Sequence, residues 1–196
     1  MHISEGVLSA PVIAVGWVAA AGGVAWGLRK LQPERIPHVA VIAAALFLAA
    51  LVRFPIGPTS MHLTLLGLAG VLLGWSAVPA LFIALMLQAI LFQFGGLVSL
   101  GANTTIMGVA ALTGGLVFRL FGTRLPMMLR AFASGFMAVV VGTVLLCAAL
   151  WLSNSDFRGT LPLIAATQLA LALIEGVVTA LIVGFMARSM PRLLAS

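Results

Sequence analysis

The chain has 196 residues, of which 63% are hydrophobic and 7% are charged, against roughly 25% charged residues in a typical soluble domain. So few charged groups exclude a soluble globular protein and indicate that lipid is the solvent. The net charge of +6 would suit a nucleic-acid partner, but the basic residues form no stripe and stand at the ends of apolar runs, as in membrane proteins.

Apolar segments separated by charged residues, proline and glycine predict a bundle of about seven transmembrane helices. A helix needs about 20 apolar residues to cross the hydrocarbon core. The length therefore leaves no room for a separate soluble domain, and residues 1–196 are expected to form a single transmembrane domain in an all-α fold. The predicted spans are 11–28, 37–52, 61–75, 78–94, 104–121, 129–152 and 161–187.

The third of these spans is short and lies between Pro58 and Pro79. We expect it to be either a short helix or a partly re-entrant one that is buried in the bundle.

Lysine and arginine residues predict the orientation of the bundle. With seven spans, all of them fall on one side except Arg53 and Arg158. The crowded side is then cytoplasmic, so the N-terminus lies outside and the C-terminus lies inside. An even number of spans would break this segregation. The expected location is the cytoplasmic (inner) membrane of a bacterium or archaeon.

The first apolar segment does not have the pattern of a cleaved signal peptide. Glu5 precedes it, no basic residue precedes it, and basic residues follow it, which is the reverse of a signal peptide. We therefore expect the N-terminus to be retained and displayed outside.

The three histidines are His2, His38 and His62. On the predicted topology, His38 lies at the cytoplasmic start of the second span, whereas His2 and His62 share the external face. Two imidazoles on one face of a nearly charge-free protein suggest a metal site, and the alternative is two unrelated interfacial histidines. The single Cys147 excludes a cage of several thiolates.

The position of His2 favours the metal site. A histidine in second place offers its ring Nδ1, its backbone amide nitrogen and the α-amine of Met1 to one metal ion, through unstrained five- and six-membered rings. His62 can supply a fourth nitrogen. A square-planar nitrogen set is typical of Ni(II) or Cu(II), and low-spin Co(II) also accepts it. Zinc prefers a tetrahedron and calcium prefers oxygen, so neither fits.

Three motifs carry a resemblance to a known family. MHISEG at 1–6, GPTSMHL at 57–63 and FGGLVSLGAN at 94–103 resemble the substrate-binding membrane component of cobalt and nickel energy-coupling-factor (ECF) transporters, the CbiM/NikM family. The resemblance covers essentially the whole chain. It implies that Met1 and His2 form the chelate and that His62 supplies the fourth nitrogen.

The resemblance also implies the substrate and the partners. Ni(II) or Co(II) is the transported ion, no organic cofactor is expected, and the sequence does not choose between the two metals. The implied partners are two cytoplasmic ATPase subunits, a transmembrane coupling subunit and often a small additional membrane subunit. The chain has no P-loop of the GxxxxGK[ST] type, so we expect a non-enzymatic subunit whose partners hydrolyse ATP.

Two positions differ from many members of that family. Phe94 and Thr64 each stand where a further histidine is common. Neither difference removes an expected ligand, but both bear on metal choice.

Residues 95–103 join the external ends of the fourth and fifth predicted spans, and in the family this segment is a loop that covers the metal. Glycines permit tight turns there, and polar side chains can orient ligating imidazoles. The alternative is that Asn103 caps the fifth span. The candidate supporting residues are Ser60, Gly95, Gly96, Ser99 and Asn103.

Three polar residues lie inside other predicted spans. Glu175 is in the seventh span, where a carboxylate is costly and usually functional. We expect it to serve packing or contact with a partner subunit rather than metal binding. Gln88 and Gln168 are expected to form hydrogen bonds between helices.

The main alternative function is a stand-alone secondary divalent-metal transporter or channel. Such proteins usually place ionisable residues along the pathway, whereas Glu175 is the only acid well inside a predicted span. An intramembrane protease and a copper sensor fit less well, because the first lacks a base beside a nucleophile and the second lacks an output domain.

Overall fold

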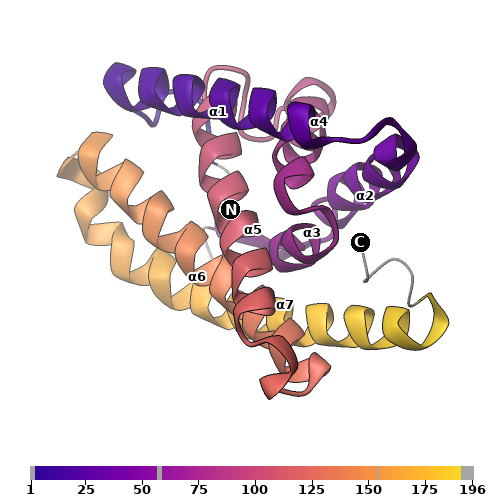
Figure 1. The fold of residues 1–196 in the computed structure, drawn as a ribbon. Coiled ribbons are helices and arrows are strands. Elements are labelled where there is room, and N and C mark those ends of the chain that lie inside the picture. The colour runs from indigo at the N-terminus through magenta and orange to yellow at the C-terminus, as the bar shows by residue number, and fades with distance from the viewer. Residues whose placement is uncertain (1–2, 57–58, 154, 191–196) are drawn as a thin grey trace.

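The computed structural model describes residues 3–56, 59–153 and 155–190. Within them the chain forms seven α-helices, four short 3-10 helices and one two-stranded hairpin (Figure 1). In chain order these elements are α1 Ala10–Lys30, η1 Pro33–Arg35, α2 Ile36–Ala49, β1 Arg53–Ile56, β2 Thr59–His62, α3 Leu66–Leu73, η2 Gly74–Ser76, α4 Ala77–Phe92, α5 Leu100–Leu120, η3 Gly122–Arg124, α6 Met127–Ser153, η4 Ser155–Thr160 and α7 Leu161–Ser189.

The predicted helical character is confirmed, and most predicted spans match a helix to within a few residues. Among the described residues, five helical segments are long and apolar enough to cross a membrane: Ala10–Lys30, Leu66–Phe92, Leu100–Leu120, Met127–Ser153 and Phe157–Ser189. The second predicted span, 37–52, corresponds to α2, which has only 14 residues. The number of seven spans and the orientation of the termini therefore stay predictions.

The third span, 61–75, is present only as a short, buried helix, as one of the two expectations allowed, and the prediction is wrong for residues 61–65. His62 ends the strand β2, which pairs with β1 in antiparallel register from Arg53↔His62 to Ile56↔Thr59. The helix that follows, α3, has only eight residues. Met61 and His62 pair with Phe54 and Arg53 in the hairpin, and extended, paired residues cannot belong to the helix that follows.

The helix α5 forms the centre of the bundle. It passes between α1 and α4 on one side and α6 and α7 on the other (Figure 1). Its residues pack against α1, α3, α4 and α6, and 13 of its 21 residues are buried. Large apolar side chains on the outside of the bundle are exposed, among them Val18, Leu152 and Phe185, as expected for a protein whose solvent is lipid.

Glycines let α3 lie directly against its neighbours. A Cβ atom added to Gly70 would collide with the carbonyl oxygen of Ala111 in α5, and one added to Gly115 would collide with the carbonyl oxygen of Gly70. A Cβ atom on Gly67 would collide with the backbone of Gly135 in α6. Small residues at helix contacts are the usual means of close packing in membranes.

We expect Gly70→Ala to lower the stability of the bundle. The added methyl group meets rigid backbone on α5, and overpacking of this kind costs about 1–3 kcal/mol. The matched control is Gly22→Ala in α1, where a Cβ atom would meet nothing within 4 Å. Thermal unfolding of the purified variants in detergent checks the prediction, and equal midpoints for the two variants would contradict it.

Candidate metal site

Asn103 holds the amino-terminal segment against the start of α5. Its Oδ1 accepts a hydrogen bond from the backbone N–H of Ile3 at 2.9 Å, and its Nδ2 donates to the carbonyl oxygen of Ile3 at 3.0 Å. Both residues are buried. One side-chain amide thus satisfies both backbone polar groups of Ile3, the residue that directly follows His2.

Ser99 lies beside the two Asn103–Ile3 hydrogen bonds, which together form a clamp on Ile3, and it directly precedes α5. Its Oγ is 2.9 Å from the carbonyl oxygen of Ile3 and 2.6 Å from that of Gly95, and a serine hydroxyl donates to one of them at a time. Ser99 is the N-cap residue of α5, so the alternative that Asn103 caps this helix is wrong. The helix begins at Leu100 instead of Thr104, which places Asn103 in its first turn.

Glu5 forms a second contact between the amino-terminal segment and the loop. Its Oε1 accepts a hydrogen bond from the backbone N–H of Val98 at 2.9 Å. Gly96 has a φ of +94°, and a Cβ atom there would collide with the Glu5 side chain. The Trp17 ring in α1 donates from Nε1 to the carbonyl oxygen of Val98 at 3.0 Å. The loop is therefore bound to both the amino-terminal segment and α1.

His62 is buried, with 2% of its surface exposed. Its Nδ1 lies 3.2 Å from the carbonyl oxygen of Leu63. The two residues that follow, Thr64 and Leu65, form the turn into α3, and Leu65 has a left-handed φ of 52°.

Glu175 of α7 binds this turn. Its Oε1 accepts hydrogen bonds from the N–H and the hydroxyl of Thr64, and both carboxylate oxygens lie about 3 Å from the N–H of Leu65. The side chain has 0% exposure. The prediction of a packing role agrees with these contacts, whereas contact with a partner subunit is wrong because the carboxylate has no accessible surface.

The structure thus gathers most of the predicted supporting residues into one place. Gly95, Gly96, Ser99 and Asn103 surround residues 3–5 of the amino-terminal segment. Met1 and His2 lie outside the described residues, and of Ser60 only the backbone is described, in β2 opposite Pro55. No group of three or more His, Cys, Asp or Glu side chains that could hold a metal is found among the described residues.

Sequence reasoning missed three contacts. It did not connect Glu5 with the loop, Asn103 with the backbone of Ile3, or Glu175 with the residues after His62. The available signal was chemical: an acid and an amide placed in apolar surroundings need partners, but the sequence does not say which ones.

The other predicted polar contacts differ from expectation. The Oε1 atoms of Gln88 and Gln168 are buried and have no hydrogen-bond partner among the described residues, so these atoms do not form the expected bonds between helices. His38 lies near the start of α2, as its predicted place in the second span requires.

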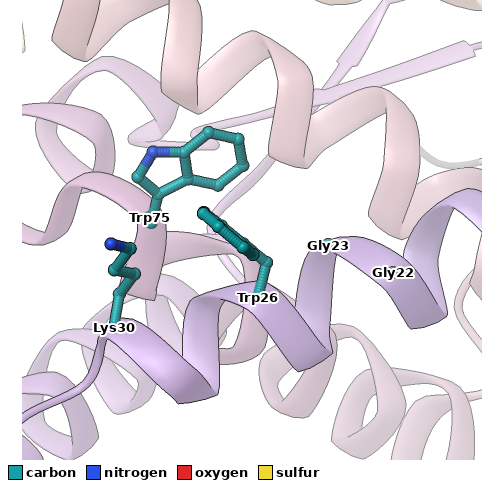
Figure 2. A pocket seen from close by; sticks show the side chains of 5 residues that line it. All are labelled: Gly22, Gly23, Trp26, Lys30 and Trp75. Atoms are coloured by element: carbon teal, nitrogen blue, oxygen red, sulfur yellow. The ribbon is translucent and has the colours of Figure 1, made fainter.

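A surface pocket lies at the other end of α1 and is not part of this site. Figure 2 shows Trp26, Lys30 and Trp75 around it, with Gly22 and Gly23 on the helix beside them. The two indoles meet edge to face at 6.3 Å, and the Lys30 ammonium lies 5.2 Å from the Trp26 ring. These side chains suit a membrane–water interface and include no usual metal ligand.

The long apolar helices are typical of an integral membrane protein, and the contacts of Ile3 and Glu5 place a candidate ion site at its amino-terminal segment. Comparison with known families then shows which kind it is. Residues 2–193 match the family CbiM, described as the cobalt uptake substrate-specific transmembrane region. The chain belongs to this family, and the resemblance seen in its three motifs is confirmed.

Named relatives agree with this assignment. The chain is 48% identical over 119 residues to a "Putative metal transport protein" of Haemophilus influenzae, a stretch covering 61% of this chain and 58% of that protein. It is 35% identical to the "Cobalt transport protein CbiM" of Sorangium cellulosum, covering 99% of this chain and 94% of the relative. It is 29% identical to the "Putative fused cobalt transport protein CbiMQ" of Methanocorpusculum labreanum, covering 100% of this chain and 36% of that protein.

A solved structure has the same fold. The protein described as a "transition metal transporter" superposes with a TM-score of 0.87 at 25% sequence identity, covering 96% of this chain and 93% of the other.

We expect Asn103→Leu to release the amino-terminal segment from α5. The nearly isosteric change leaves both backbone polar groups of Ile3 without their amide partner, at a cost of about 1–3 kcal/mol. Amide hydrogen exchange of residues 3–8 should therefore rise roughly tenfold or more. The control is Thr113→Val, which removes only a hydroxyl bonded to Val109 within α5. Equal protection of residues 3–8 in the two variants would count against the clamp.

Proposed function

We propose that this chain is the substrate-binding membrane subunit of an ATP-driven ECF-type transporter. It captures Ni(II) or Co(II) at the external face of the cytoplasmic membrane for uptake into a bacterial or archaeal cell. The proposed ligands are the α-amine of Met1, the backbone amide and imidazole of His2, and the imidazole of His62. The observation that carries the proposal is the clamp on Ile3, which fixes the backbone directly after His2.

A chelate built from the chain terminus needs such a clamp. A terminal segment normally frays, and ordering one residue costs about 1–2 kcal/mol of backbone entropy. Asn103 and Ser99 bind Ile3, and Glu5 binds the loop. These contacts reduce the ordering that metal binding would otherwise have to supply.

The surroundings of His62 suit a ligand as well. With its proton on Nδ1, the ring donates to the Leu63 carbonyl oxygen, and Nε2 carries the lone pair. A ligating histidine commonly donates its other N–H to a backbone carbonyl. Burial of the ring also limits the access of competing water.

Membership of a cobalt-uptake family and the nitrogen set support Co(II) or Ni(II) as the transported substrate. The name of the fused CbiMQ relative supports a transmembrane coupling subunit as a partner, and we propose ATPase subunits and a small additional membrane subunit beside it. A stand-alone transporter is less well supported, because it would need ionisable residues along the ion pathway. Glu175, the only acid in α7, is instead hydrogen-bonded to Thr64 and Leu65.

The proposed orientation predicts which positions face the outside. In a Cys147→Ser background, Gly159→Cys should react with a membrane-impermeant thiol reagent in whole cells, because a Cβ atom there meets open space. Gln32→Cys, exposed between α1 and α2, should react only after the membrane is permeabilised. The opposite pattern would reverse the topology and place the metal site on the cytoplasmic face.

One residue added before Met1 should abolish high-affinity binding. The change keeps every side chain but turns the α-amine into a peptide nitrogen and moves His2 to third place. Losing nitrogens that bind the metal directly should weaken binding by more than the roughly 10- to 100-fold typical of losing a contact that only supports a ligand. The measurement is metal content, affinity and the visible d–d band of protein purified with a C-terminal tag.

Two single substitutions accompany this test. His62→Ala should lower the affinity and shift the d–d band, whereas His38→Ala, on the other face of the predicted topology, should leave both near wild type. Unchanged binding in the extended protein would show that the terminal amine is not a ligand.

A further inference from the structure

The turn that follows His62 has no support from its own residues. Leu65, the N-cap residue of α3, has no capping side chain, and its backbone is in the left-handed region. That region is uncommon for residues other than glycine. Thr64 and Leu65 are themselves buried, so water does not satisfy their backbone N–H groups.

The missing acceptors come from another helix. Both carboxylate oxygens of Glu175 in α7 face the turn: Oε1 accepts from the Thr64 hydroxyl at 2.9 Å, and Oε2 accepts from the Leu65 N–H at 2.9 Å. A carboxylate at a helix N-terminus also interacts favourably with the helix dipole. One acid thus holds the turn directly before α3 across 110 residues of sequence.

The backbone of α7 is itself fixed at this level. A Cβ atom on Gly135 of α6 would lie 2.6 Å from the carbonyl oxygen of Glu175, and one on Gly176 would lie 2.8 Å from the Phe132 ring. α6 therefore lies directly against α7 at this point. The carboxylate is held on a rigid support, as a group that orients a neighbouring ligand requires.

We propose that Glu175 is a positioning residue for the metal ligand His62. By fixing Thr64 and Leu65, the carboxylate sets the direction in which the chain leaves β2, and with it the place of the imidazole two residues before Thr64. The role rests on the proposed function, in which His62 binds the ion. Glu175 touches no substrate in this scheme and acts through the turn alone.

Thr64 supplies the side-chain half of this contact. Among the described residues, its hydroxyl is the only side-chain group that donates a hydrogen bond to the Glu175 carboxylate. Thr64→Ser keeps the hydroxyl, and Thr64→Val removes it while keeping the shape.

The experiment compares metal binding with stability in full-length protein that starts at Met1. The variants are Glu175→Gln, Thr64→Val and Thr64→Ser, and the probes are Ni(II) and Co(II) as simple salts. Glu175→Gln places an amide donor opposite the Leu65 N–H, so affinity should fall about tenfold or more with a shifted d–d band. Thr64→Val should produce a smaller change in the same direction, and Thr64→Ser should restore wild-type values.

If the Glu175 contact served only the stability of the fold, the variants would behave differently. Glu175→Gln and Thr64→Val would lower the unfolding temperature of the metal-free protein but leave the affinity and spectrum of the folded fraction unchanged. The control is Thr179→Val, one turn along α7, where the hydroxyl is buried without a hydrogen-bond partner among the described residues. This variant should bind metal like the wild type.

The outcomes separate the two proposals. Wild-type affinity and spectrum in folded Glu175→Gln and Thr64→Val, with loss in His62→Ala, would overturn the positioning role and leave the metal site standing. Wild-type binding in His62→Ala would overturn the proposed metal site and the positioning role with it. If Glu175→Gln does not fold, the comparison of Thr64→Val with Thr64→Ser decides.

Discussion

Irregular backbone inside an apolar bundle must find its hydrogen bonds within the protein, and the site in this chain depends on how that need is met. An unsatisfied backbone group in lipid costs several kcal/mol. Among the described residues, Ile3 and the turn at Thr64 and Leu65 are two buried sites that are not helical. Asn103 satisfies the first and Glu175 the second. Each polar side chain thereby fixes a segment that adjoins a proposed metal ligand.

Close helix packing makes these contacts possible. Gly67 and Gly70 let α3 approach α6 and α5, and Gly135 lets α6 approach α7 beside Glu175. Gly96 plays the same part in the loop, because a side chain there would displace Glu5. The glycines remove volume at the places where a polar contact must cross between segments, so the site and the packing of the bundle are one arrangement.

Thr64 and Phe94, the two positions at which the resemblance led us to expect a further histidine, each make a defined contact. Thr64 donates its hydroxyl to Glu175, which a larger imidazole at that position would replace with a different contact. The Phe94 ring stacks on Phe92 at 5.5 Å between centroids. Thr64 therefore belongs to the contact that holds the turn after His62, whereas the Phe94 stacking joins the end of α4 to the start of the loop.

The sequence by itself determined the membrane class, the approximate extents of most helices and the family. Long apolar runs admit no other solvent, and motifs such as MHISEG and FGGLVSLGAN are local. It also identified Asn103 and Ser99 as important, because polar side chains in apolar surroundings need partners.

Only the tertiary structure decided which partners they have. The clamp on Ile3 joins residues 100 positions apart, and the contact of Glu175 with Leu65 joins residues 110 positions apart. The hairpin before α3 was missed for a different reason: its strands have four residues each and lie almost wholly between two predicted spans, and strand formation depends on packing against neighbours more than on local sequence.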